Sequence, residues 1–216
     1  MTPASSAGPS GAAPTAPALL LLELVSIARG LRVADAIAKR TPLATLAMGT
    51  MQPGNFLILA AGEVAEVEEA LVAAEEHGSS GGRAGWSHVL LPGVAPQVIA
   101  AAAGHRASAA GDTLGVVETA DAPSVLAAAD AAVKEAPVEL VTLRFGDGLG
   151  GRGYFLLTGE LADIEAAVAA AQAAVSLSAR RETAVIPRTD ELLRQSLAAA
   201  DELAPGLRLL NPAGAR

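Results

Sequence analysis

The chain has no cysteine and very few aromatic residues, which make up 2% of its 216 residues. Without thiols it forms no disulfide, thiolate metal site or cysteine nucleophile, which agrees with a reducing compartment such as the cytoplasm. Because aromatic rings are scarce, Ala, Val, Leu and Ile must fill the core of a chain that is 51% hydrophobic. Small side chains bury little area each, so we expect contacts between domains or chains to contribute much of the stability.

Basic residues and long apolar runs are scarce too. The chain has 15 Lys and Arg against 23 Asp and Glu, which gives a formal net charge of −8 at pH 7. Binding to nucleic acid needs a concentrated basic surface, so we expect no nucleic-acid partner. The longest strongly apolar run, residues 19–22, is far shorter than a membrane span, so we expect no membrane partner.

The ends of the chain have the composition of tails. Residues 1–17 contain no Lys or Arg and are rich in Pro, Ala, Ser and Gly. They lack the charged start and apolar centre of a signal peptide, and their composition is typical of disorder. We predict a disordered N-terminal tail at 1–17 and a C-terminal tail at 207–216.

The most informative feature that is present is an internal repeat. Four residues recur 95 positions later: Glu23 as Glu118, Asp35 as Asp130, Lys39 as Lys134 and Pro42 as Pro137. The segment 62–68 recurs as 159–165, at a shift of 97. A repeat of this length is a domain, so we predict a first domain at 18–104 and a second copy of it at 111–206.

Hydrophobic patterning gives both copies the same order of elements, β-α-β-β-α-β. The predicted strands are 19–26, 44–48, 56–61 and 87–91, then 113–118, 139–145, 154–158 and 183–187. The predicted helices are 31–40 and 63–77, then 123–134 and 160–175, with further helices at 94–103 and 190–203. The predicted fold class is therefore α/β (α+β): two tandem ferredoxin-like β-α-β-β-α-β domains with four-stranded antiparallel sheets.

The glycine-rich stretch 144–153 has the form of a dinucleotide fingerprint, Gly146-x-Gly148-x-x-Gly151. That fingerprint needs a helix directly after the loop, whereas a strand is predicted from Tyr154. We reject it, and we reject a kinase-type loop because the other kinase motifs are missing. Two alternatives remain: a flexible hairpin connection, or glycines that let backbones crowd around a symmetry axis.

Several segments of both copies resemble bacterial microcompartment shell proteins, in particular the unpermuted tandem-domain type. They are 22–24, 33–39, 114–119, 128–134, 138–141 and 186–188. The resemblance implies a homotrimer that mimics a hexamer, a flat tile whose central pore passes small metabolites. It also implies edge contacts with other shell proteins, hexameric and pentameric, and a cytoplasmic location in the shell of a bacterial microcompartment.

The resemblance implies that two loops line the pore. Their residues are Met51, Gln52, Pro53 and Gly54 in the first copy, and Phe145, Gly146, Asp147, Gly148 and Leu149 in the second. The family loop has a serine at the position of Asp147. We hypothesise that a trimer gathers three Asp147 carboxylates, which repel anions, and that Arg152 offsets this charge if it points inward.

Some tandem-domain members carry Cys-Pro-Gly in the first loop and hold an iron–sulfur cluster. This chain has Gln52 there and no cysteine, so we predict no cluster and no other cofactor. An ordinary turn is the alternative interpretation of this loop.

The resemblance also implies tile-edge residues: Asp35, Lys39, Asp130, Lys134 and Arg188. Each Asp–Lys pair has helical i,i+4 spacing, which equally predicts a surface ion pair. Because Gly93 stands in the first copy where Arg188 stands in the second, we expect the two copies to present unequal edges.

The remaining polar residues suggest no enzyme. His77, His88 and His105 are isolated and are predicted to be surface or loop residues rather than metal ligands. The acids between 63 and 76 are predicted to form a solvated helix face, and Trp86 a core or interface anchor. Without a paired acid and base, a nucleophile or a metal cluster, we predict that the protein is not an enzyme. The alternative function is a small-ligand-binding regulatory trimer of ferredoxin-like domains.

Overall fold

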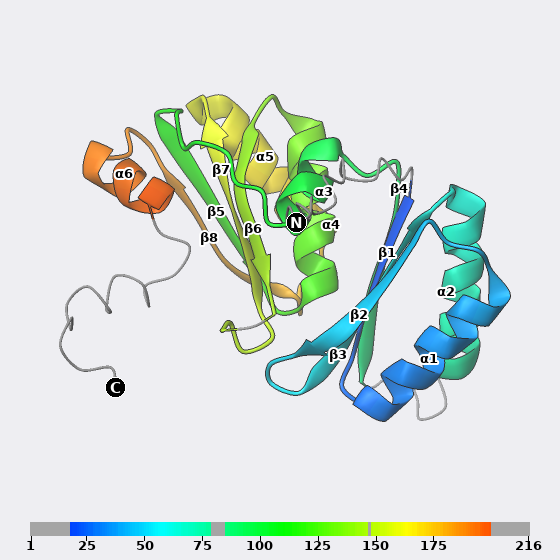
Figure 1. The fold of residues 1–216 in the computed structure, drawn as a ribbon. Helices are drawn as coiled ribbons and strands as arrows, with labels where there is room; N and C mark the ends of the chain where they lie inside the picture. Colours follow the sequence, from blue (N-terminus) through cyan, green and yellow to red (C-terminus); the bar gives the residue numbers. More distant parts are fainter. Residues whose placement is uncertain (1–17, 79–84, 147, 200–216) are drawn as a thin grey trace, which may run out of the picture. The chain divides into compact units, whose positions relative to one another are not determined.

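The computed structural model describes residues 18–78, 85–146 and 148–199 of the chain. The predicted tails at 1–17 and 207–216 lie outside these residues. The chain divides into two compact units, Met1–Ala103 and Gly104–Arg216. Each unit carries its own four-stranded antiparallel sheet (Figure 1).

The first unit follows the predicted order of elements. They are β1 (Ala18–Leu24), α1 (Ile27–Arg40), β2 (Thr45–Met51), β3 (Asn55–Gly62), α2 (Val64–Gly78), β4 (Trp86–Pro92) and the short α3 (Pro96–Ala102). The strand order in the sheet is β2-β3-β1-β4. Helices α1 and α2 pack against each other and cover one face of this sheet (Figure 1).

The second unit repeats this arrangement. Its elements are β5 (Thr113–Thr119), α4 (Ala122–Glu135), β6 (Glu139–Phe145), β7 (Gly153–Gly159), α5 (Leu161–Ala174), β8 (Arg180–Ile186) and α6 (Glu191–Ala199). The strand order β6-β7-β5-β8 matches that of the first sheet, with α4 and α5 packed together on it. The predicted fold class, two ferredoxin-like units with antiparallel sheets, is confirmed.

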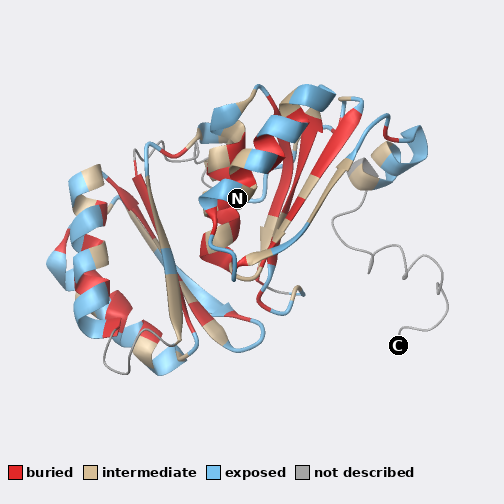
Figure 2. Cartoon of the chain, turned by 180° about the vertical axis from the view of Figure 1, so that it is seen from behind, coloured by how far each residue is buried: buried red, intermediate tan, exposed pale blue. Residues whose placement is uncertain are grey.

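Aliphatic and small residues fill the core of the first unit. Alternate residues of β1 (Ala18, Leu20, Leu22 and Leu24) pack against α1 and α2, and Val33, Ile37 and Val67 are fully buried with them. Full burial of such a side chain contributes about 1.5–3 kcal/mol. The buried sides of the helices face the sheets (Figure 2), so the two-layer architecture follows from period-2 and period-3.6 patterns that meet in one core.

The second sheet also has apolar residues on the face opposite α4 and α5. A small cluster of Ala109, Leu114, Val141 and Leu156 lies there, with Leu197 of α6 packed against it. The segment that precedes β5 contacts the edge strand β6, since Ala107 N–H donates to the carbonyl of Val141 at 3.0 Å. The C-terminal helix is therefore docked on its own unit.

Several boundaries differ from the prediction: β1 ends at Leu24 instead of residue 26, and β8 begins at Arg180 instead of residue 183. Two further differences have a clear local cause. Helix α1 begins at Ile27, before the predicted start at residue 31, because Ser26 caps it: Ser26 Oγ accepts from the Arg29 N–H at 3.3 Å. Strand β2 continues to Met51 instead of ending at residue 48, because Met48, Gly49 and Thr50 keep their pairing with β3. Pairing with β3 therefore keeps Gly49 in a strand, although glycine favours turns.

The register of the two hairpins explains the change of repeat shift from 95 to 97. The cross-strand partners Thr50 and Phe56 correspond to Phe145 and Gly153. Five residues separate the first pair and seven separate the second. The second copy therefore has two additional residues at the tip of one hairpin, and the strands on either side remain equivalent.

Candidate functional site

The tip of the first hairpin is a tight, solvent-facing turn. Gln52, Pro53 and Gly54 are exposed, whereas Met51 is buried. The Gln52–Pro53 peptide bond is cis, and Gly54 has a φ of 123° and donates its N–H to the carbonyl of Met51 at 2.9 Å. An L side chain rarely adopts that φ, so glycine is required there.

A buried carboxylate holds the base of this hairpin. Glu23 on β1 is only 6% exposed, and its Oε1 accepts from Asn55 Nδ2 at 2.6 Å. A hydrogen bond to a charged group is stronger than one between neutral groups, and a buried carboxylate needs such partners. The Glu23–Asn55 contact therefore fixes where the turn 52–54 leaves the sheet.

The tip of the second hairpin is longer, and its backbone groups form hydrogen bonds with one another. Leu149 N–H donates to the Gly146 carbonyl, and Arg152 N–H to the Leu149 carbonyl, each at 3.2 Å. Positive φ values at Gly146, Gly148, Gly150 and Gly151 explain the glycine content of this loop. A strand, β7, follows this loop and no helix begins there, as the rejection of a nucleotide fingerprint required.

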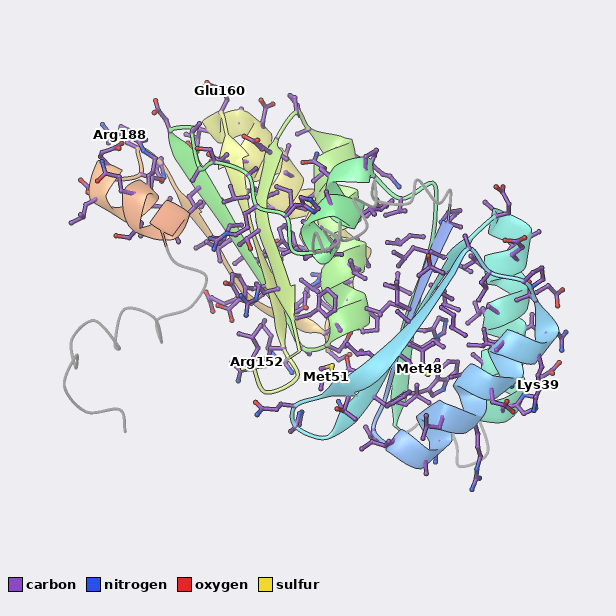
Figure 3. All side chains as sticks on the ribbon, in the orientation of Figure 1. Lys39, Met48, Met51, Arg152, Glu160 and Arg188 are labelled. Carbon is purple, nitrogen blue, oxygen red and sulfur yellow. The ribbon has the colours of Figure 1, made fainter. Side chains whose placement is uncertain are left out.

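Of the residues predicted for this second loop, Phe145 and Leu149 are half-buried, Gly146 is buried and Gly148 is exposed. Asp147 lies outside the residues that the structure describes. Arg152 is exposed at the end of the loop (Figure 3). At the position matching Arg152, the first hairpin has Asn55, so the second tip carries a cation that the first lacks.

The two predicted Asp–Lys pairs form, but in different surroundings. Lys39 Nζ lies 2.7 Å from Asp35 Oδ2, and both side chains are well exposed, 75% and 61%. Lys134 Nζ lies 2.5 Å from Asp130 Oδ2, but here the exposures are 45% and 7%. The first pair is a surface ion pair, whereas the second contains a buried carboxylate.

Arg188 lies in the turn between β8 and α6 (Figure 3). It is exposed, and its φ of 50° is the only positive value of a non-glycine residue in the part of the chain that the structure describes. Gly93, at the matching position of the first copy, has a φ of 67°. The two turns therefore share one backbone conformation and differ in the side chain that they display.

The acidic face of α2 has a structural role as well as a solvated one. Arg40, at the end of α1, donates from Nε to Glu69 Oε2 and from Nη1 to Glu76 Oε2, both at 2.9 Å. The hydrogen bond to Glu69 and the charge of Glu76 raise the pKa of Arg40. The acids predicted only as a solvated face thus also join α2 to α1.

His77, His88 and His105 are exposed, as predicted. His77 Nδ1 lies 3.0 Å from the carbonyl of Ala73, and His88 stacks on Trp86 with ring centroids 4.9 Å apart. Trp86 is half-buried and packs against the core of the first unit, which agrees with the predicted anchor. Within the described ranges, no three His, Cys, Asp or Glu side chains gather as metal ligands would, and no helix is long and apolar enough to cross a membrane.

Comparison with known proteins identifies the repeated unit. The model of the BMC domain matches the chain twice, over residues 18–93 and 113–189. The chain belongs to the BMC domain family. Its two copies make it a tandem-domain member of the bacterial microcompartment shell proteins, and the resemblance predicted from the sequence is confirmed.

Individual relatives agree with this assignment. The bacterial microcompartment shell protein PduT of Citrobacter freundii is 32% identical over 175 residues, 81% of this chain and 94% of the relative. A microcompartment protein from Desulfitobacterium hafniense DCB has a similar structure, with a TM-score of 0.70 and 32% identity, over 82% of this chain and 98% of that one.

A more distant structure is similar in fold alone. A fused permuted hexameric shell protein from the RMM microcompartment superposes with a TM-score of 0.51 at 19% identity, over 72% of this chain and 82% of that one.

Sequence reasoning missed the Glu23–Asn55 contact and the hydrogen bonds of Arg40 with Glu69 and Glu76. Both join residues about 30 positions apart, which no local pattern reveals. A usable signal existed for the first: Glu23 is a charged residue inside an otherwise apolar strand. A charge at such a position requires a partner.

Proposed function

We propose that this protein is a structural shell component of a bacterial microcompartment, that it is not an enzyme, and that it assembles as a homotrimer. Each chain supplies two BMC domains, at 18–104 and 111–206, so three chains form a six-domain tile. The observation that carries the proposal is the pair of matched sheets, β2-β3-β1-β4 and β6-β7-β5-β8, on one chain. Two equivalent units let three chains mimic a sixfold ring.

The hairpin tips are the proposed pore lining, alternating around the axis of the trimer. Gln52, Pro53 and Gly54 of the first tip are polar or small and exposed. Phe145, Gly146, Asp147, Gly148 and Leu149 form the second, with Met51 at the base of the first. Small metabolites pass through this opening, and no cofactor is bound. Positive-φ glycines support the proposal because their backbones can approach closely.

Asp35, Lys39, Asp130, Lys134 and Arg188 are the proposed edge residues. Their neighbours are other hexameric and pentameric shell proteins, in a shell within the cytoplasm. The exposed Lys39 and Arg188 support this role because both present cations to solvent. Asp130 is buried and acts at the edge only by orienting Lys134.

The experiment has two stages. Light scattering of the purified full chain should give the mass of a trimer, and electron microscopy should show sheets or tiles at higher concentration. A monodisperse trimer that binds a metabolite tightly and forms no sheets would instead favour a regulatory ligand-binding protein. Catalytic turnover by a pure sample would contradict the structural role.

Pore selectivity has its own test. Shells assembled from the wild type, Asp147→Asn and Asp147→Lys should be compared for the flux of an anionic and a neutral metabolite of similar size. We expect both variants to raise anion flux relative to neutral flux, because the substitutions remove or reverse the charge proposed at the axis. Unchanged discrimination in both variants would contradict a role for Asp147.

A further inference from the structure

Strand β2 is an edge strand with none of the features that usually protect an edge. It lies at one end of the order β2-β3-β1-β4, and all seven of its residues pair with β3 in one continuous register. It contains no charged residue, residues 47–50 are exposed, and Met48 is 45% exposed. An uncharged, regular and exposed edge can pair with a further strand, so proteins usually cover or interrupt it.

The matching edge strand of the second unit, β6, is protected in three ways. It carries the charged residues Glu139 and Arg144, and its register with β7 shifts around Val141. The segment before β5 also covers it, because Ala107 N–H donates to the carbonyl of Val141 at 3.0 Å. Val141 is only 2% exposed. Charge, irregular pairing and a covering segment thus protect β6, and β2 lacks the first two.

The covering segment of the second unit crosses one end of its sheet. It leaves the start of β5, and Ala109 lies in the apolar cluster on the face opposite α4 and α5, where it is 7% exposed. Ala107 then reaches the edge strand β6. A segment of small residues therefore connects the second strand from one edge of the sheet to that edge.

The first copy has a segment of the same reach. Ala12 lies six positions before β1, as Ala107 lies six positions before β5. Strands β1 and β2 start at the same end of their sheet, because Leu19 and Thr45 both pair with Ala61. Two strand spacings separate them, about 10 Å, whereas six extended residues span about 20 Å. The N-terminal segment is long enough to reach β2.

We propose that residues 10–14, part of the predicted N-terminal tail, cross the first sheet and cover the edge of β2. Their sequence is Ser-Gly-Ala-Ala-Pro, which is small and uncharged. Ala12 supplies the N–H that matches the donor Ala107, and Pro14 supplies an apolar side chain at the position of Ala109. The cover prevents β2 from pairing with another copy of the chain. The inference concerns a single chain and does not depend on the proposed trimer.

One hydrogen bond of the second unit has no counterpart in the first. Gly111 N–H donates to Thr158 Oγ1 at 3.0 Å, whereas Ala16 and Ala61 stand at these positions in the first copy. Alanine has no hydroxyl, so the proposed contact depends on residues 10–14 and not on the residues next to β1. We therefore expect the cover of β2 to open more readily than that of β6.

The absence of cysteine makes disulfide trapping a direct test. In the double variant Ala12→Cys with Ala47→Cys, the proposed contact brings the two Cα atoms within the distance that a disulfide requires, about 4.4–6.8 Å. Ala47 is exposed, so cysteine there leaves the core unchanged. Mild oxidation of the full chain should form an intrachain disulfide, seen as a shift in mobility on a denaturing gel. The control pair, Ala4→Cys with Ala47→Cys, should close about tenfold more slowly, because its effective concentration at β2 is lower.

Amide hydrogen exchange of the unmodified chain gives a second readout. The N–H of Ala12 should exchange about tenfold more slowly than those of Ser5 and Ser6, because a hydrogen-bonded N–H exchanges only when its bond opens. The N–H of Ala107 is the internal reference and should exchange more slowly still.

The outcomes separate the possible occupants of β2. Fast intrachain closure of the Ala12 pair, with slow exchange of Ala12, supports the inference. A disulfide between two chains, seen as a covalent dimer, would show that another copy occupies β2 and would overturn it. Equal closure rates for the Ala12 and Ala4 pairs, or exchange of Ala12 as fast as that of Ser5, would show that the segment does not lie on β2.

Discussion

Phe56 occupies the space that a side chain at Gly30 would need: a Cβ built on Gly30 lies 2.2 Å from Phe56 Cδ1. The second copy has the opposite arrangement at the matched positions, where Val125 stands for Gly30 and Gly153 for Phe56. A Cβ on Gly153 would lie 2.6 Å from the Cβ of Val125. The same contact between helix and strand is thus filled from the strand in one unit and from the helix in the other.

This relationship predicts a strong effect at Gly30. Gly30→Val should destabilise the first unit by about 1–3 kcal/mol, because the ring of Phe56 must move out of a packed core. The double variant Gly30→Val with Phe56→Gly reproduces the pair of the second copy and should recover part of the loss. Denaturant unfolding of the full chain measures both. As a control, Gly49→Val adds a side chain in open space on β2 and should have little effect.

The reciprocal change tests the second unit. Gly153→Phe alone should destabilise it by at least about 1–3 kcal/mol, since the new side chain collides with a β-branched residue. Combined with Val125→Gly, which recreates the arrangement of the first copy, it should cost less than the sum of the two single changes. If the changes in the free energy of unfolding of the two single variants add up to that of the double variant, the two side chains do not compete for the same space.

The two Asp–Lys pairs should differ in their contribution to stability. Lys39→Met removes a cation from an exposed pair and should change the free energy of unfolding by less than about 0.5 kcal/mol. Lys134→Met removes the cationic partner of a carboxylate that is 7% exposed, and should cost about 1–3 kcal/mol. Methionine keeps an apolar stem in both variants, so the comparison isolates the charge. Equal losses would contradict the difference in burial.

The stability of helix α6 itself should fall in acid. Hydrogen bonds from Arg194 and Gln195 lower the pKa of Glu191 from its ordinary value of 4.5. A group whose pKa is lowered in the folded state contributes stability above its ordinary pKa and loses it as the pH falls through the lowered value. Amide hydrogen exchange of α6 should therefore accelerate as the pH falls below 4.5, relative to the core strand β5.

A variant provides the control for that titration. In Arg194→Met the pKa of Glu191, followed by NMR, should move part of the way back toward 4.5, because the hydrogen bond from Gln195 remains, and the extra acid sensitivity of α6 should become smaller. A Glu191 titration curve identical to that of the wild type would show that Arg194 does not act on this carboxylate.

The sequence determined the fold through features that are local or repeated. Alternation in β1 and the helical spacing of α1 and α2 each define one apolar face, and two such faces can be buried only against each other. The repeat, with shifts of 95 and 97, then transferred the order of elements from one copy to the other. Scarcity of aromatic residues likewise predicted a core of small aliphatic side chains, which the Ala-rich α2 and α5 bear out.

Boundaries set by capping and pairing were less accessible from the sequence. Helix α1 begins before the predicted residue because the side chain of Ser26 accepts a hydrogen bond at its N-terminus. Gly49 lies in a strand despite its turn propensity because it pairs with β3. Both outcomes depend on backbone partners, which a residue's own identity does not reveal.

Only the tertiary structure decided how the matched positions differ. It placed Asp130 in a buried site and Asp35 in solvent, although both lie four residues before a lysine. It also placed the larger side chain on the strand in the Gly30–Phe56 contact and on the helix in the Val125–Gly153 contact. The physical reason is that burial and steric fit are properties of surroundings assembled from distant segments, whereas periodicity and turn chemistry are encoded in neighbouring residues.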